Sequence, residues 1–305
     1  MHVTTTVAAF LEIPPYVLWP YVAGSALALL GLLAAMEKIS QSDGWDRILA
    51  LASVCLAPPL AVFGTEHLLL AKFVMNDVPA WMPFRLFWAY FVGVALIAAA
   101  LSIAVKVQVH LSATLLGIMI FIFVLTVHTP KIIANPHDRI IWAVALRDSS
   151  FAGGAWALAG SQTEEWRNHG TNILVTIGRF LIAIGAIFFA VEHFRHPEFM
   201  PGVPLAKLTP TWIPIRQFVG YLTGAVLLLA GTSLLLGMKK RSAATCLGSF
   251  ILFLVLLVYL PTVIGIPSAA QGGEKIEGLN YFFDTLLYSG AVLALAGAMP
   301  KPLRS

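Results

Sequence analysis

The sequence has few charged residues. Asp, Glu, Lys and Arg make up 11% of its 305 residues, whereas 59% are hydrophobic, and the mean hydropathy is +0.85. Soluble domains carry about a quarter of charged residues, so this composition indicates a polytopic helical membrane protein. The net charge of +4 comes with no basic cluster interleaved with aromatic residues, and we therefore expect no nucleic-acid partner.

Cysteine is almost absent, and the common redox motifs are missing. Cys55 and Cys246 both lie inside apolar runs, and without a CxxC motif we expect neither a disulfide nor a thiol redox pair. The chain also has no Rossmann glycine motif, no CxxCH haem-attachment motif and no Glu-x-x-His metal pair, so no metal site is predicted. Residues 1–15 contain no Lys or Arg, so no cleavable signal peptide is predicted.

Long apolar runs dominate the rest of the chain. A bilayer core requires about 20 apolar residues per helix, and only helices satisfy their backbone groups there without closing a barrel. We therefore predict an all-α integral membrane protein with nine transmembrane helices. The expected spans are 16–36, 47–70, 84–105, 111–133, 141–160, 171–194, 215–237, 242–263 and 280–299.

Polar residues recur along the chain in the same order. Each feature has a counterpart 126 to 136 positions later, and the offset changes only in polar loops. The pairs are Glu66-His67 with Glu192-His193, Trp81 with Trp212, Arg85 with Arg216, His128 with Tyr259, and Asp148 with Asp284. This repetition predicts two four-helix units, 45–163 and 164–305, after an N-terminal tail and extra helix in residues 1–44.

An even number of helices per unit places both copies in the same orientation. Such parallel repeats are related by an axis along the membrane normal, so every repeated polar residue falls on one membrane face. We expect one shallow polar pocket per unit. The basic cluster Lys239-Lys240-Arg241 and the tail residues Lys301 and Arg304 lie on the opposite face. Lys and Arg otherwise divide evenly between the two faces, so the positive-inside rule alone gives no clean answer. The basic cluster, the basic C-terminal tail and the uncharged N-terminal tail lead us to expect the pockets on the non-cytoplasmic face, as would suit a bacterial inner membrane.

The repeated acids and histidines are the candidate catalytic residues. Glu66 and Glu192 lie near helix C-termini, where the helix dipole disfavours an anion, and intramembrane ionisable groups are candidates for function. His67 and His193 can exchange protons near neutral pH. The alternative for the histidines is an interfacial anchor that bonds to a lipid headgroup or a loop carbonyl.

The remaining repeated residues are candidate ligand-binding groups. Arg85, Arg216, Asp148 and Asp284 could hold a ligand, or could form Glu–Arg–Asp clamps that only fix the bundle. Trp81 and Trp212 are typical of an aromatic belt, with stacking on a flat ring as the alternative. The second copy has Tyr259 in place of His128, so a haem between His67 and His128 is the less favoured ligand. The second copy has Phe283 at the position that corresponds to Arg147, so we expect the first unit to have the site with more polar groups.

The pattern resembles the DoxX/DoxD-like membrane protein family. The resemblance rests on a four-helix unit with Glu-His at the end of its first helix, a Pro-x-Arg phrase opening the second and an acid in the fourth, and it covers about 45–300 as two fused units. It implies quinone-linked redox chemistry, with quinone as the ligand and a redox protein or larger membrane complex as partner. The fusion and the extra N-terminal helix depart from the family pattern.

Three functions remain open at this point. The first is a subunit of a quinone-linked redox system, whose electrons come from a partner because the chain has no visible electron carrier. The second is a non-catalytic scaffold inside a respiratory complex. The third is a transporter or lipid carrier, which is less favoured because the charges gather near one surface and not at the midplane.

Overall fold

The computed structural model describes residues 13–169, 172–266 and 270–300. Long helices make up most of this part of the chain, and its β-structure is limited to one isolated bridge between Phe199 and Leu208. The predicted all-α class is therefore confirmed. The tails used to assign the cytoplasmic side, residues 1–12 and 301–305, lie outside the described residues.

The helices follow the predicted apolar runs closely. The first half contains α2 (Pro15–Gln41), α3 (Asp46–Leu49), α4 (Ala52–Leu69), α5 (Ala71–Val74), α6 (Arg85–Val105), α7 (Val109–Phe123), α8 (Thr129–Ala134), α9 (Arg139–Gly160) and α10 (Glu164–His169). The second half contains α11 (Ile173–Arg195), α12 (Arg216–Leu236), α13 (Lys240–Leu254), α14 (Leu260–Ile264) and α15 (Gly272–Gly297).

Eight helical segments of the described chain are long and apolar enough to cross a membrane. This confirms the membrane class that the composition predicted. The one predicted span outside these eight segments is 141–160, which corresponds to α9. This helix has 22 residues, but its hydropathy is lower because it carries Arg147 and Asp148 next to two serines. It packs against α7, α11 and α15, so other helices cover its polar side chains.

Two short π-helical segments connect helices in equivalent places. The segment η1 (Val124–His128) joins α7 to α8, and η2 (Val255–Tyr259) joins α13 to α14. Pro130 and Pro261 follow two residues later; each lacks an N–H and clashes with the carbonyl four residues back. The backbone widens ahead of each proline, as π-bulges do near functional sites, and His128 and Tyr259 end the widened turns.

Other unusual backbone features recur at the same spacing of 131 residues. The residues preceding α6 and α12, Phe84 and Ile215, both have positive φ, as do Gln108 and Lys239 before α7 and α13. Left-handed backbone is uncommon for residues other than glycine. Its recurrence in step with η1 and η2 means that equivalent positions of the two halves share local geometry as well as sequence.

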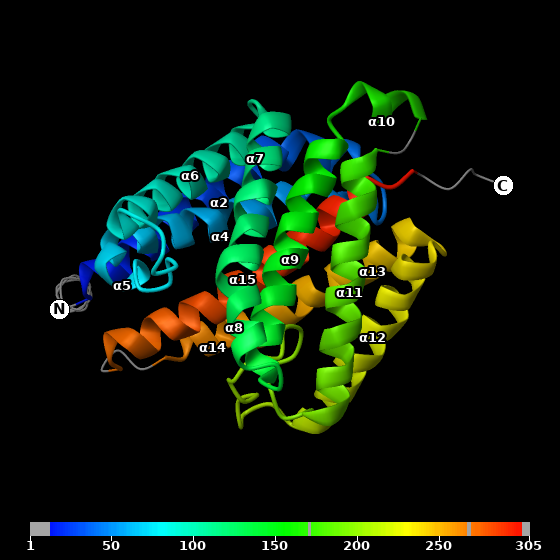
Figure 1. The fold of residues 1–305 in the computed structure, drawn as a ribbon. Helices are drawn as coiled ribbons and strands as arrows, with labels where there is room; N and C mark the ends of the chain where they lie inside the picture. The colour runs from blue at the N-terminus through cyan, green and yellow to red at the C-terminus, as the bar shows by residue number, and fades with distance from the viewer. Residues whose placement is uncertain (1–12, 170–171, 267–269, 301–305) are drawn as a thin grey trace, which may run out of the picture.

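The long helices contact one another in a closed order (Figure 1). Around this ring α4 contacts α6, α6 contacts α7, α7 contacts α9 and α9 contacts α11, followed by α12, α13, α15 and a return to α4. The helices α9 and α15 also contact each other across the ring, and α2 covers α4. The fourth long helix of each half therefore packs against the first long helix of the other half.

Candidate functional site

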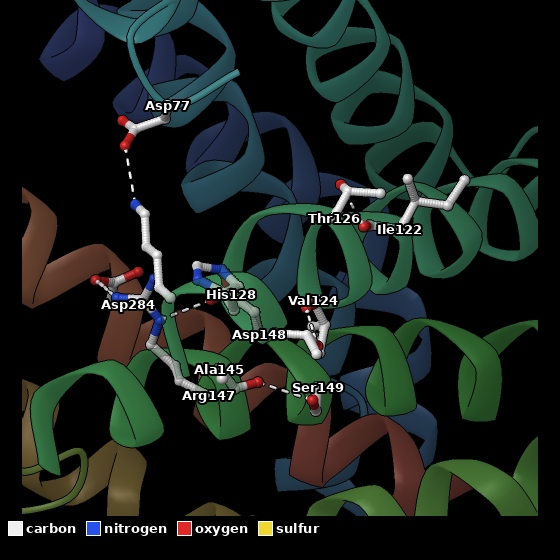
Figure 2. Close-up of polar contacts among 12 residues, drawn as sticks. Asp77, Ile122, Val124, Thr126, His128, Ala145, Arg147, Asp148, Ser149 and Asp284 are labelled. Carbon is white, nitrogen blue, oxygen red and sulfur yellow. Dashed lines mark hydrogen bonds and ion pairs between the residues drawn. The ribbon is translucent and has the colours of Figure 1, made fainter. Parts of the chain in front are cut away.

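The centre of the polar cluster is Arg147 on α9. Its Nη1 donates to Asp284 Oδ2 on α15 at 2.6 Å, and its Nε donates to Asp148 Oδ1 at 2.9 Å. His128, at the end of η1, bonds through Nε2 to Asp148 Oδ2 at 2.8 Å. Figure 2 shows these four side chains pointing toward one another from three elements. They form one buried network that joins both halves of the chain.

The network extends to α4 through α15. The side-chain amide of Asn280, one turn before Asp284, faces Glu66; with its nitrogen toward the carboxylate it donates to both oxygens, at 2.8 and 3.1 Å. Asn280 and Asp284 lie one turn apart on α15, so Glu66 faces the same helix that supplies a carboxylate to Arg147. We call the set of Glu66, His128, Arg147, Asp148, Asn280 and Asp284 the central network.

The central network contains more acid than base. It contains three carboxyl groups and one guanidinium, and an uncompensated charge costs several kcal/mol when it is removed from water. At least one proton or further positive charge must therefore accompany these groups. His128 and the carboxyl groups are the sites that can hold it, so the network is able to store and transfer protons.

The side chains of the central network remain partly accessible. Those of His128, Asp148, Arg147 and Asp284 are 12–16% exposed. Arg147 lies eight residues into α9, about 12 Å along a helix that rises 1.5 Å per residue. An arginine at this depth requires partners, and two carboxylates supply them.

Three of the equivalent residues of the second half are sealed, whereas Asp284, the equivalent of Asp148, is itself part of the central network. Glu192 and His193 are 3% and 0% exposed, and Tyr259 is 1% exposed. Glu192 pairs with Arg139 of α9 at 3.4 Å, while the Tyr259 hydroxyl donates to the carbonyl of Pro201 at 2.9 Å. The second half thus has no partly accessible counterpart of the central network at these positions.

The predicted Glu–Arg clamps do not form. Arg85 instead donates through Nε to the carbonyl of Val78 at 3.0 Å, and Arg216 is exposed at the start of α12. Among the described residues neither arginine pairs with Glu66 or Glu192.

Three other predicted residues also lie outside the central network. Trp81 and Trp212 are 72% and 55% exposed, positions typical of the aromatic belt. His67 follows Glu66 on α4 but bonds through Nδ1 to the carbonyl of Phe63 at 2.7 Å. That bond requires a proton on Nδ1 and leaves Nε2 as an acceptor.

The pocket expected within each unit is replaced by an arrangement across units. Asp148 and Asp284 meet at Arg147 because α9 contacts α15, while Glu66 meets Asn280 because α15 contacts α4. The order of residues in the sequence predicts which residue types recur but not which helices become neighbours. The fourth long helix of each half can pack either within its own half or against the other half.

Two important residues were missed from the sequence, Asn280 and Arg139. Asn280 is not repeated, because Val144 occupies the corresponding position, and the counterpart of Arg139 is Lys275, which keeps only the charge. Asn280 could have been found from its spacing, since it precedes Asp284 by four residues and therefore lies on the same face of the helix. Arg139 gave no such signal.

An apolar groove lies beside α4, and none of its lining residues belongs to the central network. It has a volume of about 460 Å³ and runs between α2 and α4, where Trp19, Val22, Thr65 and Leu68 are among its lining residues. Thr65 and Leu68 flank Glu66 and His67 in sequence. The groove can accept an acyl or prenyl chain, whereas the network offers hydrogen-bond donors, acceptors and protons.

The haem considered from the sequence is not favoured by this geometry. Nε2 of His128, the nitrogen that commonly binds iron, is engaged by Asp148 at 2.8 Å. Comparison with family models, curated proteins and solved structures finds no match for this chain. The resemblance to DoxX/DoxD-like proteins therefore rests on the repeated residues alone.

Proposed function

We propose that the protein is the membrane subunit of a quinone-linked redox system and binds a quinone headgroup at the central network. The observation that carries this proposal is the partly accessible His128–Asp148–Arg147 arrangement inside a membrane bundle. A quinone oxygen accepts hydrogen bonds when oxidised and requires a proton when reduced. An imidazole paired with a carboxylate, beside a guanidinium, provides both.

In this proposal each group has a distinct task. Arg147 directs the quinone oxygen by donating a hydrogen bond, and His128 transfers a proton to it while Asp148 holds the imidazole in place. Glu66 and Asp284 resupply protons. Reduction of a quinone to a quinol takes up two electrons and two protons, and the electrons come from a redox partner protein. The apolar groove beside α4 would hold the prenyl tail.

The finer architecture belongs to the same proposal. The repeated η1 and η2 segments and the repeated positive-φ residues support two parallel four-helix units with nine membrane-spanning helices in all. The basic cluster at Lys239, Lys240 and Arg241 begins α13, and Tyr259 lies at the other end of the same run. The positive-inside rule then favours a site on the non-cytoplasmic face of a bacterial inner membrane.

Extraction of lipids from the purified protein tests this function. The wild-type chain, solubilised gently, should retain close to one quinone per chain, and added decylubiquinone should bind reversibly. His128→Ala should reduce the affinity about tenfold, which corresponds to one lost hydrogen bond. The matched control is His137→Ala, because His137 is exposed in the loop before α9 and should leave binding unchanged. Absence of both retained and added quinone would reject the proposal.

One observation favours a non-catalytic scaffold as the second candidate. Every carboxylate of the central network already has a partner within the chain, as expected for a structural fastening between helices. If the protein is a scaffold, His128→Ala should lower the free energy of unfolding, and neither the variant nor the wild type should bind quinone. Native mass measurement of the gently extracted protein would then show a larger complex, whereas a lone monomer or homodimer argues against a scaffold.

A further inference from the structure

The loops that follow α4 and α11 differ sharply between the two halves. Of residues 70–84 only Ala71 is buried, and Trp81 is 72% exposed. In the second half residues 200–205 are all buried, with Met200 at 1% and Val203 at 2% exposure. The second loop is five residues longer. This difference is why corresponding residues lie 126 positions apart before the loop and 131 positions apart after it. We call residues 200–205 the plug.

A single peptide group of the plug lies between two repeated residues. The carbonyl of Pro201 accepts from the Tyr259 hydroxyl at 2.9 Å, and the N–H of Gly202 donates to His193 Nε2 at 3.1 Å. The carbonyl and the N–H belong to one planar unit and point in opposite directions. The plug therefore presents an acceptor on one side and a donor on the other, as a bound ligand would.

Several further contacts fix the plug in place. Arg139 donates to the carbonyls of Pro204 and Leu205 at 3.0 and 2.9 Å, and its guanidinium lies over the Phe199 ring, 4.0 Å from the centroid. The Tyr281 hydroxyl accepts from the N–H groups of Ala206 and Lys207, which directly follow the plug. Gly202 has φ of +112°, which favours glycine at this turn.

The corresponding residues of the first half have no such occupant. His67 is the counterpart of His193, and its Nε2 is left as an acceptor because Nδ1 bonds to Phe63. No described residue is bonded to that Nε2. His128 occupies the position that corresponds to Tyr259. The described hydrogen bonds of Arg147 use Nε and Nη1, which leaves Nη2 as a further donor. The described hydrogen bonds thus leave an acceptor on His67 and a donor on Arg147 in the first half.

We propose that the second half is closed by its own Pro201–Gly202 peptide group and that only the first half binds a ligand. The ligand class is a planar hydroxy-carbonyl group: its hydroxyl donates to His67 Nε2, and its second oxygen accepts from Arg147. A half-reduced quinone headgroup has this pattern, and a quinol matches it when the oxygen of its second hydroxyl is the acceptor. The inference rests on the proposed function for the ligand, whereas the closed second site stands on the plug contacts alone.

Stoichiometry separates the two halves. Reduced decylubiquinone is titrated into the full chain in lipid nanodiscs, with binding followed by calorimetry. One site per chain is expected, and His67→Ala should weaken it about tenfold through loss of one hydrogen bond. Leu208→Ala is the control, since Leu208 is exposed in the same loop outside the plug, and it should change neither affinity nor stoichiometry.

Opening the plug tests the closure directly. Gly202→Pro removes the N–H that bonds to His193 and does not tolerate positive φ, so it should raise the stoichiometry from one to two. Hydrogen exchange of the Gly202 amide should be slow in the wild type and fast in His193→Ala. Two sites in the wild type, or rapid exchange of Gly202, would overturn the closure. Slow exchange with no bound quinol would leave the plug established and reject the proposed function instead.

Discussion

At the residue scale the protein depends on a guanidinium placed between two carboxylates. Arg147 is the only base within hydrogen-bonding distance of both Asp148 and Asp284 among the described residues. Removing one partner of a buried ion pair leaves an uncompensated charge. The rest of the central network consequently depends on this one side chain for its charge balance.

Replacement of Arg147 tests that dependence. Arg147→Ala should lower the free energy of unfolding by about 3–5 kcal/mol, the usual cost of breaking a buried pair, as measured by chemical unfolding in detergent micelles. Arg216→Ala is the matched control, because Arg216 is exposed, and it should change the free energy by less than about 0.5 kcal/mol. Adding Asp284→Asn to Arg147→Ala should recover part of the loss; no recovery would contradict the charge argument.

The sequence predicted most of these residue types but not their pairings. Glu66, Asp148 and Asp284 were recognised because they repeat, and the repetition needs no knowledge of the fold. Asn280 and Arg139 are unique to one half, so repetition could not reveal them. The pairing of Glu66 with Asn280 in place of Arg85 depends on which helices become neighbours, and this is a property of the whole bundle.

At the element scale, small residues decide how closely helices approach. A Cβ added at Gly153 of α9 would lie 2.9 Å from the carbonyl oxygen of Gly178 on α11, so the two backbones are almost in contact. Close approach through glycine is a common way for membrane helices to associate. It places Arg147 and Arg139 of α9 against the second half.

A single methyl group should disturb this contact. Gly153→Ala should lower the free energy of unfolding by about 1–3 kcal/mol through overpacking, measured by chemical unfolding in micelles. Gly297→Ala on α15 is the matched control, since an added Cβ there meets nothing within 4 Å, and it should be neutral or stabilising by up to about 1 kcal/mol. Equal effects of the two substitutions would show that the α9–α11 contact is not tight.

The helices themselves were predictable, whereas their irregular turns were not. Apolar runs of about 20 residues fix where a helix crosses hydrocarbon, so the predicted and observed spans agree to within a few residues except at the start of α15, Gly272, which lies eight residues before the predicted 280. That first stretch is polar, with Glu274, Lys275 and Glu277, and no hydropathy pattern marks it. The π-helical turns depend on Pro130 and Pro261. Both prolines are visible in the sequence, but the sequence does not show that the backbone widens into a π-helical turn before each of them.

At the scale of the whole molecule the two halves of the chain are interlocked. Each fourth helix packs against the first helix of the other half, α9 on α11 and α15 on α4, and Arg241 of α13 also pairs with Asp46 of α3 at 2.7 Å. The recurring polar residues were visible in the sequence, yet the crossed packing was not, because a hydrophobic face does not specify which apolar helix packs against it.

Separating the two halves should therefore destroy both. Fragments 1–163 and 164–305, each expressed alone, should fail to give a monodisperse peak in detergent, because α4 loses α15 and α11 loses α9. Coexpressed from one membrane they should copurify through a tag on either fragment and regain the melting temperature of the intact chain to within a few degrees. Introducing Gly153→Ala into the coexpressed pair should weaken copurification, while Gly297→Ala should not. Two fragments that are each stable alone would show that the units are independent domains and that the central network forms only after they have folded.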